Sequence, residues 1–131
     1  MKEIILILLS HWIADFVCQS DKIAKNKSKS NKILFWHIVQ YIAVMYNLIF
    51  WSLLVFGEFS LSSASALGFI GFILLNGVLH FVIDYFTSRL TSYYFNNQMY
   101  HEGFVIVGLD QFLHTTLLIV TYNSMVSKII V

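Results

Sequence analysis

The sequence predicts an all-α polytopic membrane protein, a four-transmembrane-helix bundle with both the N-terminus and the C-terminus outside (N-out/C-out). Apolar residues make up 58 % of the 131 residues and charged residues only 11 %, which lies outside the range of ordinary soluble domains. The charges are also clumped, so that four long apolar segments remain between them, and proline is absent. We expect one membrane domain over residues 1–131.

The predicted helices are the apolar segments 4–19, 33–56, 67–90 and 104–126. The last three each exceed the roughly 20 residues that are needed to cross about 30 Å of hydrocarbon. The first is short, and a short span is accommodated by local thinning of the bilayer or by flanking residues that reach the headgroups. Because it carries His11 and Asp15 and lacks a clear cleavage site, we interpret it as a retained helix rather than a signal peptide.

The basic residues indicate the orientation of the bundle. Five of the eight lie in the first loop, at Lys22, Lys25, Lys27, Lys29 and Lys32. Arg89 flanks the next loop on the same side, whereas the opposite side carries Lys2, Lys128 and the acidic Glu58. The positive-inside rule therefore places both loops in the cytoplasm, in a multi-pass protein of the cell inner (plasma) membrane. We interpret the lysine run chiefly as this orientation signal, in contact with anionic lipid.

Composition also excludes some classes of protein and site. A net charge of +1 gives no support for a nucleic-acid binder, whose basic residues would be spread over a face. Cys18 is the single cysteine, so the chain can form no internal disulfide and no cysteine-based zinc site.

Three aspartates lie inside apolar segments, where a carboxylate costs on the order of 3 kcal/mol or more at the bilayer centre. Each has a histidine four residues away, in the pairs His11 and Asp15, His80 and Asp84, and Asp110 and His114. Residues at i and i+4 share one face of a helix, so each helix presents an imidazole and a carboxylate to the same side.

These side chains also share a depth. Counted at about 1.5 Å per residue from the cytoplasmic ends of the helices, four of them lie roughly 6 to 9 Å inside the boundary: Asp15, His37, Asp84 and Asp110. The other histidines, His11, His80 and His114, each lie one turn deeper. The order within the pair reverses on the fourth helix, as alternating helix directions require.

A carboxylate-rich ring with an imidazole ring one turn deeper predicts a site for one or two divalent metal ions in the bundle core, as in helical bundles that use similar spacings. Nitrogen and oxygen ligands without thiolate suit Zn, Mn or Fe and do not select among them. Two alternatives remain open: three interhelical His–Asp hydrogen bonds that only hold the bundle together, and a proton or ion relay.

The ordered motifs resemble a known family. The run His11-x3-Asp15-Phe16-x2-Gln19, then Ala24-Lys25-Asn26-Lys27, His37, His80-x3-Asp84 and Asp110-Gln111-x2-His114 is similar to the DUF3307 family of small bacterial and phage membrane proteins. The layout also resembles, in architecture only, the YdjM-type membrane-bound metal-dependent hydrolases.

The second resemblance implies a set of metal ligands, namely His11, Asp15, His37, His80, Asp84, Asp110 and His114. It also implies Gln19 and Gln111 as substrate contacts. Some relatives are expected to carry a further histidine after His37, where this chain has Gln40 and Tyr41, so its second helix is expected to supply one ligand.

The leading functional hypothesis is a metal-dependent hydrolase that acts at the cytoplasmic leaflet on a phosphate-bearing lipid or small molecule. The metal would activate a water molecule, with Asp15, Asp110 or His37 as the base, while Lys25 and Lys27 would hold phosphate. The alternatives are a component of divalent-ion or proton transport, for which the outer half offers few polar residues, and a structural subunit with a polar core.

Overall fold

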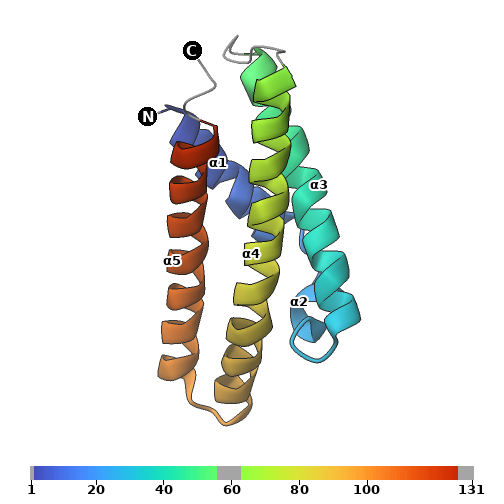
Figure 1. Cartoon of the computed structure of the whole chain (residues 1–131). Coiled ribbons are helices and arrows are strands. Elements are labelled where there is room, and N and C mark those ends of the chain that lie inside the picture. Colours follow the sequence, from blue (N-terminus) through green and yellow to red (C-terminus); the bar gives the residue numbers. More distant parts are fainter. Residues whose placement is uncertain (1, 56–62, 127–131) are drawn as a thin grey trace.

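Every regular element that the computed structural model describes, over residues 2–55 and 63–126, is helical (Figure 1). The elements are α1 (Lys2–Trp12), the π-helical turn η1 (Ile13–Val17), α2 (Asp21–Asn26), α3 (Asn31–Val55), α4 (Ser63–Asn96) and α5 (Tyr100–Met125). The predicted all-α fold class is therefore confirmed. The predicted helix end at Phe56, and the outer residues Glu58 and Lys128, lie outside the described residues.

Three helices are long and apolar enough to cross a membrane, over Asn31–Ser52, Ala66–Asn96 and Tyr100–Met125. The first helical stretch is shorter, with 11 residues in α1 and five in η1, or about 24 Å at 1.5 Å per residue. A fourth span and the orientation of the bundle stay predictions. Figure 1 shows the start of α1 and the end of α5 at one end of the molecule, with α2 and the α4–α5 turn at the other.

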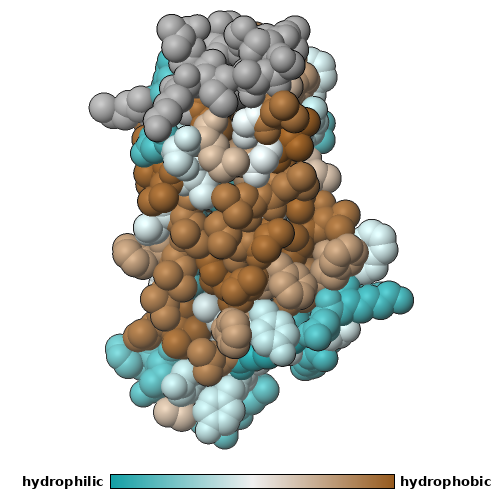
Figure 2. Space-filling model, in the orientation of Figure 1, coloured by the Kyte–Doolittle hydropathy of each residue, from teal (hydrophilic) through white to brown (hydrophobic). Residues whose placement is uncertain are grey.

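The surface agrees with a lipid environment. Figure 2 shows apolar side chains gathered over the middle of the molecule, and polar side chains at the end that carries α2 and the α4–α5 turn. Large apolar side chains on three different helices are exposed, including Trp51 (60 %), Val78 (62 %) and Phe112 (64 %). A bilayer would cover this surface and remove it from water.

The helices at the α2 end of the molecule differ from the predicted segments, and α5 begins at Tyr100 rather than at residue 104. α4 continues past Leu90 to Asn96, because no proline or glycine lies between Gly77 and Gly103 to end it, and only Asn97–Met99 separates it from α5. The lysine-rich segment, expected to be a loop, contains the short helix α2. The side chain of Ser20 caps α2 by accepting a hydrogen bond from the backbone N–H of Ile23 at 3.4 Å.

The end of the bundle that is remote from α2 is packed mainly with apolar side chains. Tyr41, Met45, Phe72 and Leu118 are buried there or next to the histidines. A buried polar pair lies among them, because the Asn76 amide donates to the Thr121 hydroxyl at 2.8 Å. A well-packed apolar core therefore encloses the histidines on this side.

Glycine 103 allows a close approach of α4 and α5. A Cβ atom on Gly103 would overlap the ring of Phe95, whereas a Cβ on Gly108, on the same helix, would meet nothing within 4 Å. We therefore expect Gly103→Ala to destabilise the protein by about 1–3 kcal/mol through overpacking, and Gly108→Ala to stabilise it by up to about 1 kcal/mol through helix propensity. Thermal unfolding of the two detergent-solubilised variants checks this, and equal unfolding temperatures would refute the close packing.

Candidate metal centre

The seven predicted ligand residues lie in one cluster that joins the first helical stretch to α3, α4 and α5. Six of them are buried, namely His11, Asp15, His37, His80, Asp84 and His114, and Asp110 is half-buried. Ionisable side chains are rare at such depth in a membrane protein and are expensive unless they are paired or bind an ion.

The turn η1 positions Asp15. In this turn the backbone N–H of Cys18 donates to the carbonyl of Ile13 at 2.9 Å, one residue further along the chain than in an α-helix. The carbonyl of Cys18 in turn accepts a hydrogen bond from the side-chain amide of Gln40 on α3. Single π-helical turns occur frequently at functional sites, and this one fixes the carboxylate of Asp15 against α3 and α4.

Four side-chain atoms converge at one point. The Nε2 atom of His37 lies 3.1 Å from Asp15 Oδ1 and 3.4 Å from Asp84 Oδ2. The Nε2 atom of His80 lies 3.5 Å and 3.6 Å from the same two oxygens. The two Nε2 atoms are 3.3 Å apart. Five of the six distances among these four atoms thus fall within 3.1–3.6 Å.

This spacing fits a tetrahedral metal ion. Ligand atoms at about 2.0–2.1 Å from zinc, arranged as a tetrahedron, are about 3.3–3.4 Å from one another. Asp15 Oδ1 is also buried without a hydrogen-bond partner among residues 2–55 and 63–126, and a bound cation would satisfy it. We call Asp15, His37, His80 and Asp84 the four-ligand centre. The donors are two imidazoles and two carboxylates, so they suit Zn, Mn or Fe.

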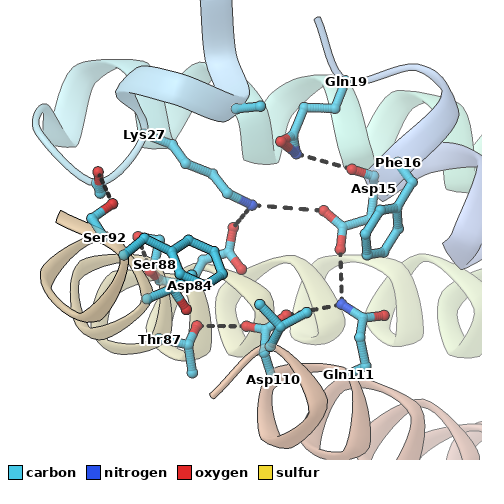
Figure 3. A pocket seen from close by; sticks show the side chains of 15 residues that line it. Asp15, Phe16, Gln19, Lys27, Asp84, Thr87, Ser88, Ser92, Asp110 and Gln111 are labelled. Carbon is cyan, nitrogen blue, oxygen red and sulfur yellow. Dashed lines mark hydrogen bonds and ion pairs between the residues drawn. The ribbon is translucent and has the colours of Figure 1, made fainter. Parts of the chain in front are cut away.

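Lys27 reaches the same centre from the segment after α2. Its Nζ donates to Asp84 Oδ2 at 2.7 Å and lies 3.9 Å from Asp15 Oδ1, with its side chain only 16 % exposed (Figure 3). Burial alone would lower the pKa of this ammonium group, but the charges of Asp84 and Asp15 outweigh burial and raise the pKa above its usual 10.5. Lys27 is therefore charged at neutral pH and partly neutralises the two carboxylates.

A cavity of about 290 Å³ borders the centre on the side of Lys27. Five hydroxyl side chains line it, namely Ser28, Thr87, Ser88, Thr91 and Ser92. Asp15, Asp84 and Asp110 form the wall toward the centre, and Phe16 and Val107 add an apolar wall. The cavity can therefore take a ligand that has both a polar, hydrogen-bonding end and an apolar part.

The sequence profile of a family described as "Protein of unknown function (DUF3307)" matches residues 4–130. The chain belongs to the DUF3307 family. This confirms the first resemblance that the motifs suggested. No curated protein and no solved structure matches the chain.

Three of the four predicted substrate contacts in this DUF3307 protein line the cavity, and the fourth, Lys25, does not. Gln19 lines the cavity, and its amide donates to the backbone carbonyl of Asp15 at 2.9 Å. Gln111 also lines it and donates to Asp110 Oδ2 at 2.9 Å. Lys25 is not brought to the site, because its side chain is 76 % exposed and lies 3.6 Å from Asp21. Of the two predicted lysines, Lys27 alone lines the cavity.

Two further residues of this DUF3307 protein contact the cluster and were not predicted as part of the site. The hydroxyl of Thr87 donates to Asp110 Oδ1, and the hydroxyl of Tyr41 lies 3.2 Å from Nδ1 of His11. Thr87 lies three residues after Asp84 and seven after His80, so its helical spacing could have indicated it. Tyr41 lies four residues after His37 and carries the same signal.

Proposed function

We propose that this DUF3307 protein is a membrane-embedded metal-dependent hydrolase that acts at the cytoplasmic leaflet on a phosphate-bearing lipid or small molecule. The observation that supports it best is the four-ligand centre, whose spacing fits one divalent ion, next to a cavity lined by an ammonium group and five hydroxyls. The architectural resemblance to YdjM-type hydrolases points to the same class.

The chemistry is divided between a metal and the protein's own side chains. A divalent ion held by the four-ligand centre would supply a Lewis acid that lowers the pKa of water and polarises a phosphoryl oxygen. Lys27 would hold a phosphate group by charge. The hydroxyls of Ser88 and Ser92 donate to the Asp84 carbonyl and to Ser28 in this structure, and they would turn from these acceptors to donate to the phosphate. The apolar wall at Phe16, whose side chain is 48 % exposed, favours a lipid as the substrate.

Asp110 is the best candidate for the general base. It lines the cavity, and it does not belong to the four-ligand centre, whereas Asp15 and His37 do. Its two oxygens accept hydrogen bonds from Thr87 and Gln111, which fix the carboxylate in place. A positioned base contributes typically 10²–10⁴-fold to the rate.

The transport alternative has less support. A conduit would need polar side chains that continue past the histidines, but the side chains packed there include Tyr41, Met45, Phe72 and Leu118. The buried pair of Asn76 and Thr121 is hydrogen-bonded and therefore satisfied. The proposal accordingly places the chemistry at the end of the bundle that carries α2.

The test is phosphate release from phosphatidic acid in mixed micelles and from p-nitrophenyl phosphate, with protein loaded with Zn or Mn. We expect turnover that a chelator removes, and an Asp110→Asn variant that keeps its metal content but loses at least about 100-fold in kcat. His101→Gln, an exposed histidine on α5, is the matched control and should retain full activity. The hydrolase proposal would be overturned if metal-loaded wild type released phosphate from both substrates no faster than Asp110→Asn.

A further inference from the structure

The four-ligand centre uses only one oxygen of each aspartate. The other oxygen of Asp84 lies toward His114, and the other oxygen of Asp15 lies toward Gln111. Asp84 Oδ1 is 3.9 Å from Nε2 of His114, and Asp15 Oδ2 receives only a 3.5 Å contact from the Gln111 amide. Each carboxylate therefore keeps one oxygen outside the four-ligand centre.

His11 and His114 are arranged as a pair of ligands. The Nδ1 atom of His11 lies 3.2 Å from the Tyr41 hydroxyl, and that of His114 lies 3.4 Å from Asp110 Oδ2 without forming a hydrogen bond within the described residues. Metal-binding histidines usually have one ring nitrogen held by a hydroxyl, carbonyl or carboxylate, which aims the other at the ion. The Nε2 atoms of both are buried and have no hydrogen-bond partner within the described residues.

These groups are close enough to share an ion. Ligand atoms of His11, Asp15 and His114 lie within 4.8 Å of one another, and all three residues are buried. The rings of His11 and His114 have their centroids 5.4 Å apart. Unpaired buried nitrogens are costly, and a bound cation would satisfy both of them together with the spare carboxylate oxygens.

A competing set is less suited to a second ion. Ligand atoms of Asp84, Asp110 and His114 also lie within 4.8 Å of one another. Both oxygens of Asp110, however, already accept hydrogen bonds, from Thr87 and Gln111. That set would also leave Nε2 of His11 buried and unsatisfied.

We propose that the cluster is a dinuclear centre, in which Asp15 and Asp84 bridge two divalent metal ions. His37 and His80 complete the first ion's ligands, and His11 and His114 complete those of the second. This inference rests on the proposed metal-dependent function and deepens it. Two ions about 3.5–4 Å apart are the arrangement that stabilises both the attacking and the leaving oxygen in phosphoryl transfer.

The test is elemental analysis by mass spectrometry of detergent-purified protein, together with electron paramagnetic resonance after loading with Mn²⁺ alone. We expect two equivalents of metal and an exchange-coupled signal in the wild type. His11→Ala and His114→Ala should each retain one equivalent, with the six-line signal of isolated Mn²⁺. The control His101→Ala should keep two equivalents and the coupled signal. The one equivalent of metal that remains in each variant shows that the four-ligand centre is still folded. If His11→Ala aggregates, His11→Gln takes its place.

The outcomes separate this inference from the proposed function. One equivalent in the wild type, lost in His37→Ala and unchanged in His11→Ala, would overturn the second ion and leave the single-metal function standing. No metal in folded wild type would overturn both. Two equivalents of metal in His11→Ala, together with one equivalent in Asp110→Asn, would overturn the assignment of His11 to the second ion. The second ion would then be bound by Asp84, Asp110 and His114.

Discussion

Replacing Asp84 with alanine is expected to abolish tight binding of a divalent metal and to destabilise the metal-free protein by about 3–5 kcal/mol. The carboxylate is a member of the four-ligand centre and the closest partner of Lys27, at 2.7 Å. Loss of a residue that merely orients a ligand typically costs 10–100-fold in metal affinity, so loss of a ligand should cost at least about 100-fold. Removing one partner of a buried ion pair leaves an uncompensated charge, which accounts for the loss of stability.

Metal content checks the predicted loss of metal binding, and thermal unfolding in chelator checks the predicted loss of stability. Both are measured on the same preparations. Asp21→Ala is the matched control, because the side chain of Asp21 is 95 % exposed and its pair with Lys25 lies at the surface, where such pairs are worth about 0–1 kcal/mol. Full metal occupancy in Asp84→Ala would refute the centre. A stability loss in Asp84→Ala, with no metal in the wild type, would instead support the structural-subunit alternative.

The second large effect concerns Lys27. Lys27→Met is expected to destabilise the metal-free protein by about 3–5 kcal/mol, because Asp15 and Asp84 lose the ammonium group that neutralises them. The same change should tighten metal binding at least about tenfold. A unit charge about 4 Å away is worth about 4 kcal/mol at an effective dielectric constant of 20, and the ammonium repels an incoming dication.

Unfolding in chelator and in excess Zn²⁺ separates these two effects, since a ligand that binds only the folded state stabilises it in proportion to its affinity. The raised pKa of Lys27 means that its contribution to stability is fully present below pH 10.5 and is lost as the pH rises from there through the folded-state pKa. The difference from wild type should therefore be the same at pH 7 and pH 9. Lys25→Met is the control. Equal unfolding temperatures of Lys25→Met and Lys27→Met in chelator would contradict the role of Lys27 in neutralising the two carboxylates. Weaker metal binding by Lys27→Met than by wild type would contradict it as well.

The sequence was sufficient to predict the all-α fold class and the residues that gather at the centre. Apolar length indicates the long helices, and the spacing of His80 and Asp84 places both on one face, since these patterns depend only on helix geometry. The end of α4 was predicted too early, because polar residues after Leu90 resemble a loop although nothing there ends the helix.

Lys27 and Lys25 were both predicted as phosphate contacts, and the sequence could not distinguish between them. Lys25 and Lys29 lie in the same polar run, and only the packing of α2 against α3, with the hydrogen bond from Ser92 to Ser28, brings Lys27 to Asp84. The interpretation of the run chiefly as an orientation signal, with Lys25 and Lys27 as phosphate contacts, therefore did not anticipate a buried ion pair. The turn η1 was equally hidden, because the side chain of Gln40, distant in sequence, binds its end.

The turn η1 also determines which changes in length the chain can tolerate. A π-helical turn contains one more residue than an α-helical turn, so deleting one residue from Ile13–Val17 would restore a regular helix. The residues on either side of the deletion would keep nearly their present orientation relative to one another, because the π turn takes up its extra residue within one turn. A deletion between His11 and Asp15 would bring them to a spacing of three residues, which still places both on one face of the helix. A gap of one residue at this point in a sequence alignment would therefore mark a chain whose first helix is α-helical throughout and still presents its ligands.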